Sequence, residues 1–238
     1  MQSTRNKLIQ LLANHDDQYI SGQMLSEKLN ISRSAIWKHM KALEDEGFII
    51  EGKSKLGYRI IKYPDRLNEY ALKRGLDTTW LGNTIIFKEQ MPSTQTLAHE
   101  LAQNQAEHGT VIIASEQTAG KGRMNRTWHS PKEKGMWLSM ILRPTIFPYL
   151  APQLTLLTAT VLAQVIIEQT PLHPKIKWPN DILIHDKKVA GILTEMKAEQ
   201  DQIEYVVIGI GLNVNQEPSE LPDDLKQKVT IFLANKGL

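Results

Sequence analysis

The 238-residue chain contains no cysteine and no long uninterrupted apolar run. The absence of cysteine excludes disulfides and thiolate metal sites, and it is typical of proteins in a reducing cytoplasm. Because no run of about 18 apolar residues occurs, the sequence predicts no membrane span. The segment from Met1 to Lys7 also lacks the apolar core of a signal peptide. We therefore expect a cytoplasmic protein.

Several catalytic signatures are missing as well. The sequence has no H-E-x-x-H, no G-x-S-x-G and no Cys/His metal spacing, so no protein-held metal is predicted. Residues 47–54 match the phosphate-loop pattern G-x-x-x-x-G-K-S, but that motif needs a preceding strand and a following helix. Here a helix precedes and a strand follows, which argues against a phosphate-loop ATPase.

The small net charge of +2 is unevenly distributed. Residues 1–63 hold ten Lys/Arg against seven Asp/Glu, whereas the remainder is slightly acidic. The same N-terminal segment predicts three short helices and a hairpin with strands over 48–51 and 58–61. Ser21 and Ser32 are expected N-caps, and Ile36, Met40 and Leu43 share the inner face of the third helix.

This order of elements predicts a winged helix-turn-helix domain over residues 1–63, in which the third helix enters the DNA major groove. The expected DNA-binding residues lie on that helix and at the hairpin tip, where lysines meet phosphates: Ser32, Arg33, Ser34, Lys38, Lys41, Lys53 and Lys55. A polar face that is merely solvated is the open alternative.

Residues 64–238 predict a second domain, which begins at a linker near Pro64. A long helix over 152–169 is apolar almost all round, so we expect it to be mostly buried. The remaining expected elements are helices over 67–76 and 94–103 and strands over 84–88, 111–114, 136–142, 175–184, 189–195 and 205–211. The fold class is therefore α+β, with a mixed sheet in the second domain.

Three polar stretches interrupt these elements. The loop over 120–128 alternates glycines with Lys121 and Arg123, and such a loop can bring cations and backbone N–H groups to an anion. Ser93-Thr94-Gln95 opens a helix after a strand, where simple N-capping by Ser93 is the favoured interpretation when the segment is taken alone. A proline in W-P-N-D indicates a strand edge or a bulge that aims Lys177, Asn180 and Asp181 into a site.

Taken together, these stretches resemble the biotin–protein ligases, and the N-terminal module resembles that of the bifunctional ligase–repressors. The matching segments, in order, are 93–95, 117–128, 177–181, 188–193 and 209–213. The resemblance implies a catalytic domain of the class II synthetase-like type. It also implies ATP, biotin and transient Mg²⁺ as reactants, and formation of biotinyl-5′-AMP. The biotin carboxyl carrier protein of acetyl-CoA carboxylase is the implied acceptor. Operator DNA is a further partner, bound by a homodimer that the adenylate favours.

The resemblance also implies residue roles. Biotin would be bound by Ser93, Thr94, Gln95, Gln117, Lys121, Gly122, Arg123 and Lys188. The adenylate would be bound by Arg126, Trp128, Asn180, Leu212 and Asn213. Lys188 would stabilise the transition state, Arg123 would hold the adenylate, and Asp181 would lie near the reacting amine or the metal.

The sequence departs from the family pattern at three places. Lys121 replaces the first arginine of G-R-G-R, and Gln95 replaces an asparagine. Residues 228–233 do not match the family's A-T-S-L segment, and the chain stops at Leu238. We expect from this that the SH3-like C-terminal domain is absent, that turnover is impaired and that biotin binding is retained.

Two other functions stay open at this stage. A DNA-binding regulator that only senses a ligand would transfer nothing. A lipoate–protein ligase would share the fold and the adenylation chemistry.

Overall fold

The computed structural model describes residues 4–13, 15, 18–64, 67–73 and 76–220. Its contacts divide the chain into two compact units, Met1–Arg74 and Gly75–Leu238. The boundary between the units lies just after the short helix α4 (Glu69–Lys73), which contacts α1. The sequence had predicted the boundary between residues 63 and 64. The 228–233 segment lies outside the described residues.

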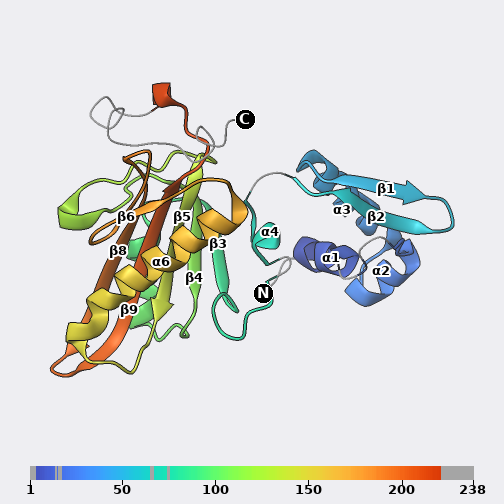
Figure 1. The fold of residues 1–238 in the computed structure, drawn as a ribbon. Helices are drawn as coiled ribbons and strands as arrows, with labels where there is room; N and C mark the ends of the chain where they lie inside the picture. The colour runs from blue at the N-terminus through green and yellow to red at the C-terminus, as the bar shows by residue number, and fades with distance from the viewer. Residues whose placement is uncertain (1–3, 14, 16–17, 65–66, 74–75, 221–238) are drawn as a thin grey trace. The chain divides into compact units, whose positions relative to one another are not determined.

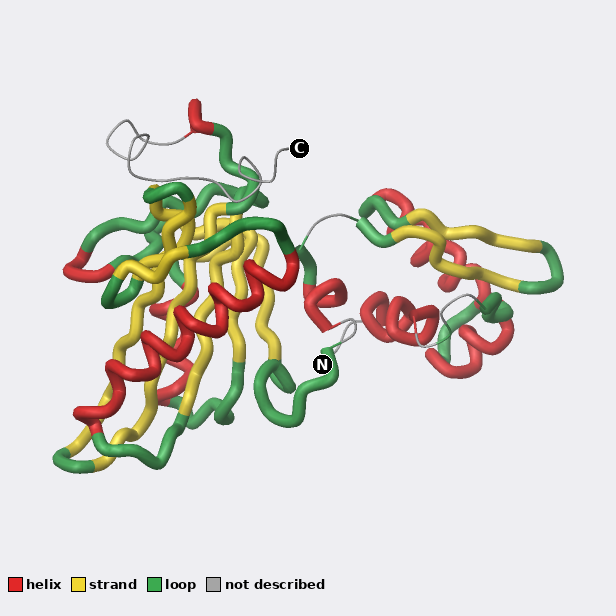
Figure 2. Tube along the Cα trace, viewed as in Figure 1, coloured by secondary structure: helices red, strands yellow, loops and turns green. Residues whose placement is uncertain are grey.

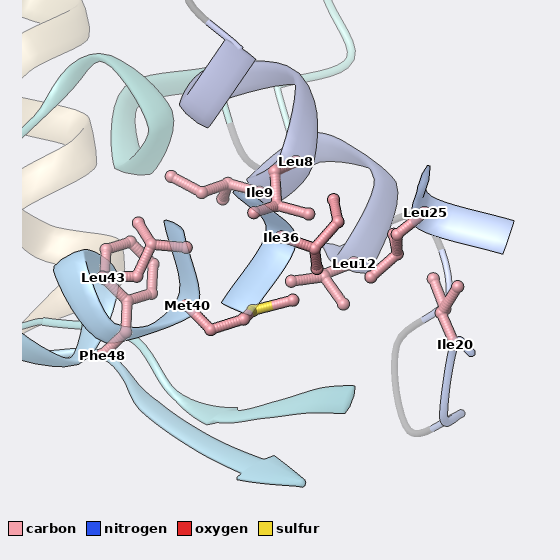
Figure 3. Packing of buried hydrophobic residues seen from close by; sticks show 9 residues of the cluster. All are labelled: Leu8, Ile9, Leu12, Ile20, Leu25, Ile36, Met40, Leu43 and Phe48. Carbon is pink, nitrogen blue, oxygen red and sulfur yellow. The ribbon is translucent and has the colours of Figure 1, made fainter. Parts of the chain in front are cut away.

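The N-terminal unit has the expected three helices and hairpin (Figures 1 and 2). These are α1 (Thr4–Ala13), α2 (Gly22–Leu29), α3 (Arg33–Asp45), β1 (Ile49–Lys53) and β2 (Gly57–Lys62). The Oγ atoms of Ser21 and Ser32 accept the N–H groups of Met24 and Ala35, which confirms both N-caps. Figure 3 shows Ile36, Met40 and Leu43 of α3 in one cluster with α1 side chains. The helical spacing of apolar residues therefore builds this core.

The C-terminal unit is organised around one seven-stranded sheet of order β3-β4-β5-β9-β8-β7-β6. Only β3 and β4 are parallel; all other neighbours are antiparallel, so the sheet is mixed as expected. Its strands are β3 (Ile85–Met91), β4 (Val111–Gln117), β5 (Gly135–Leu142), β6 (Lys175–Lys177), β7 (Asp181–Ile184), β8 (Lys187–Glu199) and β9 (Gln202–Asn213). The helices are α5 (Thr94–Gln103) and α6 (Ala151–Gln169). Single 3₁₀ turns lie at Arg123–Asn125, Pro148–Leu150 and Pro218–Glu220.

The two helices pack on opposite faces of the sheet. Successive side chains of a strand point to opposite faces. On β9, Tyr205 and Val207 pack in the cluster of α5, while Val206 and Ile208 pack in that of α6. Continuing this alternation along β9 places Gly209, Gly211 and Asn213 on the α5 face. Polar residues at the N-terminal end of α5 therefore meet a sheet surface that carries no side chain at the two glycines.

The helix α6 is less buried than its composition predicts. Ala159, Ala163 and Ile166 pack on the sheet, but Leu156, Leu157, Val161 and Val165 are exposed. The prediction of a mostly buried helix was wrong because a helix lying across one sheet buries only the side that faces it. The segment Pro148–Gln169 is long and apolar enough to cross a membrane by length and composition alone. Helices in protein cores can meet the same two criteria.

Candidate active site

The N-terminal end of α5 presents a polar side chain to a pocket beside the sheet. Ser93 precedes the helix, yet its Oγ makes no capping hydrogen bond. The atom is buried and has no partner among the residues that the structure describes. The N–H of Thr94 is satisfied instead by Gln117 Oε1, at 2.8 Å. The capping interpretation of Ser93 was wrong, and its hydroxyl is available to a ligand.

Behind this end of the helix, three polar side chains form the floor of the pocket. Thr94 Oγ1 lies 2.9 Å from Ser139 Oγ, which donates to Gln95 Oε1 at 3.0 Å. A Cβ on Gly209 would stand 2.6 Å from that same Gln95 oxygen, so a side chain there would have to displace the Gln95 amide. Sequence reasoning missed Ser139. The signal was present, because Ser139 is the one polar residue of the strand G-M-W-L-S-M-I-L.

A carboxylate fixes the orientation of the Gln95 amide. Gln95 Nε2 donates to Glu195 Oε2 at 2.8 Å, and His99 Nε2 lies 3.1 Å from the same oxygen. The hydrogen bond with His99, aided by that from Gln95, lowers the pKa of Glu195 despite partial burial, which acts in the opposite direction. Neither Glu195 nor His99 was predicted, since they lie 96 residues apart and neither belongs to a motif.

This arrangement predicts a measurable acid sensitivity. Because the pKa of Glu195 is lower in the folded state, its stabilising contribution is present above the ordinary value near 4.5. That contribution is lost as the pH falls through the folded pKa. We expect Glu195→Gln to lose less thermal stability than the parent between roughly pH 5 and pH 3. The difference should be only about 1–3 °C, because solvent screens a half-exposed pair.

The experiment is a series of calorimetric melts across that pH range. Glu199→Gln, an exposed residue of the same strand, is the matched control and should follow the parent. Parallel pH profiles for parent and Glu195→Gln would contradict the assigned ion pair.

The central loop folds back on itself as a narrow hairpin over the pocket. Lys121 and Thr127 form an isolated antiparallel β-bridge. The Gly122 N–H donates to Arg126 O at 2.7 Å, and the Trp128 N–H donates to Gly120 O at 2.8 Å. The Gly122 N–H is thus already used within the loop, which weakens the expectation of an anion-binding nest at this glycine. The loop still supplies cations, because Lys121, Arg123 and Arg126 are exposed.

The indole of Trp128 lies directly over two glycines of the sheet. A Cβ on Gly211 would approach Trp128 Cε2 to 2.4 Å, and one on Gly191 would approach its Cζ3 to 2.8 Å. Trp128 Nε1 is buried and has no hydrogen-bond partner in the described part of the chain. The close approaches to the backbone at Gly209 and Gly211 are therefore made by Gln95 and Trp128, and the indole N–H suits a polar ligand.

Lys188 sits at the centre of the site. Its Nζ lies 2.8 Å from Asp181 Oδ1 and 4.9 Å from the centroid of the Trp128 ring. The contact with Asp181 is an ion pair and not an aligned hydrogen bond. Both side chains are about three-quarters buried, so water screens the pair only partly. A cation held here attracts negative charge on a bound substrate.

Two adjoining cavities share this lysine. The first has an empty volume of about 430 Å³, including its open mouth, and all eight predicted biotin-binding residues line it. The second, larger cavity is lined by Arg126, Asp181 and Asn213. Gly122, Arg123, Trp128, Asn180 and Lys188 line both. The geometry thus provides a small compartment joined to a large one at a cationic junction.

One predicted contact is not brought to the site. Leu212 is buried in the core cluster under α6, on the sheet face opposite Gly211 and Asn213. The alternation of side chains along β9 explains this placement. The W-P-N-D segment forms a tight turn between β6 and β7, with Lys177 paired to Asp181. Because β6 is the edge strand of the sheet, the proline lies at a strand edge, one of the two predicted alternatives. The turn brings Lys177, Asn180 and Asp181 to the larger cavity.

Within residues 4–220, apart from the gaps given above, no three His, Asp or Glu side chains converge to hold a metal ion. Mg²⁺ characteristically binds through substrate phosphates and one or two carboxylates. Asp181 and Asp186 line the larger cavity and fit that mode.

In the N-terminal unit, the predicted DNA-binding side chains are exposed, but two of the cations are already paired. Lys41 Nζ lies 2.7 Å from Glu44, and Lys53 Nζ lies 3.3 Å from Glu51. Hydrogen bonds from Tyr19 and Arg59 lower the pKa of Glu51 to about 2, so it stays charged at neutral pH. Ser32 is used as a cap, and Ser34 Oγ lies 2.9 Å from its hydroxyl.

Comparison with known proteins identifies the family to which this chain belongs. Residues 87–213 match the Biotin/lipoate A/B protein ligase family, and residues 4–59 match an HTH domain. This chain belongs to the biotin/lipoate A/B protein ligase family. It is 49% identical over 231 residues to a protein of Bacillus subtilis (strain 168) named bifunctional ligase/repressor BirA. That match covers 97% of this chain and 71% of the relative.

Solved structures of the family agree. A biotin protein ligase from Aquifex aeolicus in complex with biotin and ATP is 33% identical, with a TM-score of 0.56. The match covers 66% of this chain and 62% of that one, so this chain spans less than two thirds of the solved ligase. A Leishmania major biotin protein ligase in complex with biotinyl-5-AMP is 26% identical, with a TM-score of 0.54 and 65% of each chain covered.

Proposed function

We propose that the chain is an ATP-dependent biotin–protein ligase that also acts as a biotin-responsive DNA-binding repressor. The ligase assignment rests on one structural observation, a small polar compartment and a large one that meet at Lys188. Relatives named as ligases belong to the same family, which supports it. The ordered helix-turn-helix unit and the ligase/repressor relatives support the second activity. The expected cytoplasmic location remains a proposal, consistent with bacterial relatives.

The small compartment fits the ureido ring of biotin. A cyclic urea carries two N–H donors and one carbonyl acceptor. Ser93 Oγ, which is buried without a partner in the described structure, can donate to that carbonyl. The indole of Trp128, seated on Gly191 and Gly211, lines the same compartment and offers an apolar wall to the biotin rings. The tail carboxylate would then reach the junction at Lys188 and Arg123.

The first step joins two anions. A carboxylate oxygen of biotin attacks the α-phosphorus of ATP, a new O–P bond forms, and pyrophosphate leaves. Lys188 and Arg123 reduce the repulsion and stabilise charge that develops in the transition state. ATP would lie in the larger cavity, near Arg126, Trp128 and Asn213. Mg²⁺ bound to the phosphates would supply further neutralisation.

In the second step the amine of a carrier-protein lysine attacks the acyl carbonyl. A C–N bond forms, the C–O bond to phosphate breaks and AMP leaves. Asp181, beside Lys188, lies where it can take the amine proton or face the metal. Before this step the site must exclude water, because the intermediate is a mixed anhydride. The hairpin of the central loop over the pocket suits that task.

The test is mass spectrometry of the chain incubated with biotin, ATP, Mg²⁺ and a biotin carboxyl carrier domain. We expect biotinyl-adenylate to appear first and a single biotinylated lysine on the carrier afterwards. A carrier lysine to alanine variant is the matched control. Adenylate without transfer would identify a ligand-sensing regulator, and absence of both would refute the ligase assignment. A calorimetric titration of biotin against lipoate, with biotin binding at least tenfold tighter, separates the two ligase classes.

A homodimer favoured by the adenylate is part of the repressor proposal. Two winged helices on one assembly would match a two-fold operator. Sedimentation of the chain with and without biotin plus ATP tests this point. A monomer under both conditions would argue against a dimeric repressor.

A further inference from the structure

The outward face of α3 carries an aromatic side chain that the core does not use. Ile36, Met40 and Leu43 face inward, as Figure 3 shows. On the other side of the helix, Arg33, Trp37 and Lys41 follow each other at intervals of four residues. Trp37 is 54% exposed. Burying an indole is favourable, so an exposed one on a helix of this kind is available for binding.

A groove runs beside Trp37, between α3 and the β1–β2 turn. Its walls include Arg33, Trp37, Lys53, Lys55 and Tyr58, and no carboxylate of the described residues lines it. Arg33 and Lys55 have no ion-pair partner within the described structure, while Lys53 is shared with Glu51 and lies over the Tyr19 ring. The groove is therefore a cationic rim around one exposed aromatic ring.

Charge and shape together select the occupant. Cations on the rim favour a polyanion, and the aromatic ring between them favours an apolar group on that polyanion. The DNA major groove offers one such group, the C5-methyl of thymine, beside phosphates at its edges. An acidic peptide would satisfy the cations but would not require a helix of this shape.

We infer that Trp37 is a specificity-determining residue that contacts a thymine methyl group in the major groove, while Arg33 and Lys55 contact phosphates. This inference rests on the proposed repressor function and makes it more specific. Trp37 should then contribute to discrimination between sequences, and the lysine should contribute equally to all sequences.

The experiment uses the full chain with biotin and ATP. A duplex is first enriched from a randomised pool by the parent chain. Trp37→Ala should weaken binding to that duplex about tenfold and leave binding to an unselected duplex nearly unchanged. At one or more thymines, replacement by deoxyuridine removes the methyl group. We expect this replacement to weaken the parent but not Trp37→Ala, a non-additive result that reports direct contact.

Two matched variants sharpen the test. Lys55→Ala should weaken both duplexes and reduce the slope of affinity against salt by about one. Trp80→Ala removes another indole of similar exposure (44%) from the other unit and should leave the affinity for both duplexes unchanged. Because Trp37 is exposed, its variant should melt with the parent. If the alanine variant unfolds, the measurements are made instead on Trp37→Gln, which keeps a long side chain.

Each remaining outcome is decisive. Equal losses on both duplexes, or a deoxyuridine effect that is the same in parent and variant, would overturn the role of Trp37 while leaving the repressor function in place. If the parent enriches no duplex at all, the repressor function fails, and the inference fails with it.

Discussion

Replacing Lys188 with alanine is expected to slow formation of biotinyl-adenylate by about 100- to 1000-fold, equivalent to roughly 2.7–4 kcal/mol of transition-state stabilisation. The reason is position: Lys188 lies where the two cavities meet, and in the proposed reaction both substrates bring negative charge to that point. Affinity for biotin should fall much less, because we propose that Ser93 and the residues around it make the ureido contacts. The measurement is a single-turnover assay of pyrophosphate release.

The neighbouring lysine provides the control. Lys187 begins the same strand but is exposed and lines neither cavity, so Lys187→Ala should stay within about threefold of the parent. Removing Lys188 also leaves Asp181 without its ion-pair partner. The double variant Lys188→Ala, Asp181→Asn separates the two effects, because it restores the charge balance without restoring a cation. Adenylation by Lys188→Ala within about tenfold of the parent would exclude an essential role.

Replacing Arg123 with glycine is expected to release the intermediate. Arg123 Nη1 donates to Asn180 Oδ1 at 3.1 Å, and this pair lies between the two cavities. A charged hydrogen bond to phosphate contributes about 1.5–3 kcal/mol, so biotinyl-adenylate should dissociate roughly 10- to 150-fold faster from the variant. The measurement is the fraction of adenylate that stays with the protein through rapid gel filtration.

Glycine also changes the backbone, and a matched control is available for that effect. Asn125 belongs to the same loop, is exposed and lines neither cavity. Asn125→Gly introduces a glycine without removing a cation and should retain the adenylate. Arg123→Gln removes the charge without adding flexibility and should behave like Arg123→Gly. An Arg123→Gly variant that holds the adenylate as tightly as the parent would refute the assignment.

The roles proposed for these two cations differ because one lies on a strand and the other on a loop. Lys188 pairs with Leu183 of β7, and pairing of its strand with β9 begins at Ala190. This strand pairing fixes the position of Lys188 before substrates bind. Arg123 belongs to the hairpin of the central loop, held by the bonds of Gly122 and Trp128. A cation on a strand is suited to stabilise a transition state, and one on a loop is suited to close over a product. This difference predicts a rate defect for one variant and a retention defect for the other.

Local patterns in the sequence determined much of the fold. The N-caps at Ser21 and Ser32 were predictable because short-range hydrogen bonds alone set them. The bounds of α5 and the inner face of α3 were predictable because apolar spacing sets them. The site residues implied by the family resemblance all line one or both cavities, with Leu212 as the exception, although Ser139 was missed.

What only the tertiary structure decided depends on contacts between distant segments. Ser93 Oγ accepts no helix N–H, while the first N–H of α5, that of Thr94, donates to Gln117, 23 positions along the chain. Glu195 and His99 meet because β8 passes α5. One side of α6 is exposed because the helix packs on one face of the sheet with its other side only. Local sequence sets which backbone groups bond to near neighbours. The partner of a side chain far along the chain is set by strand order and by the face on which each residue falls.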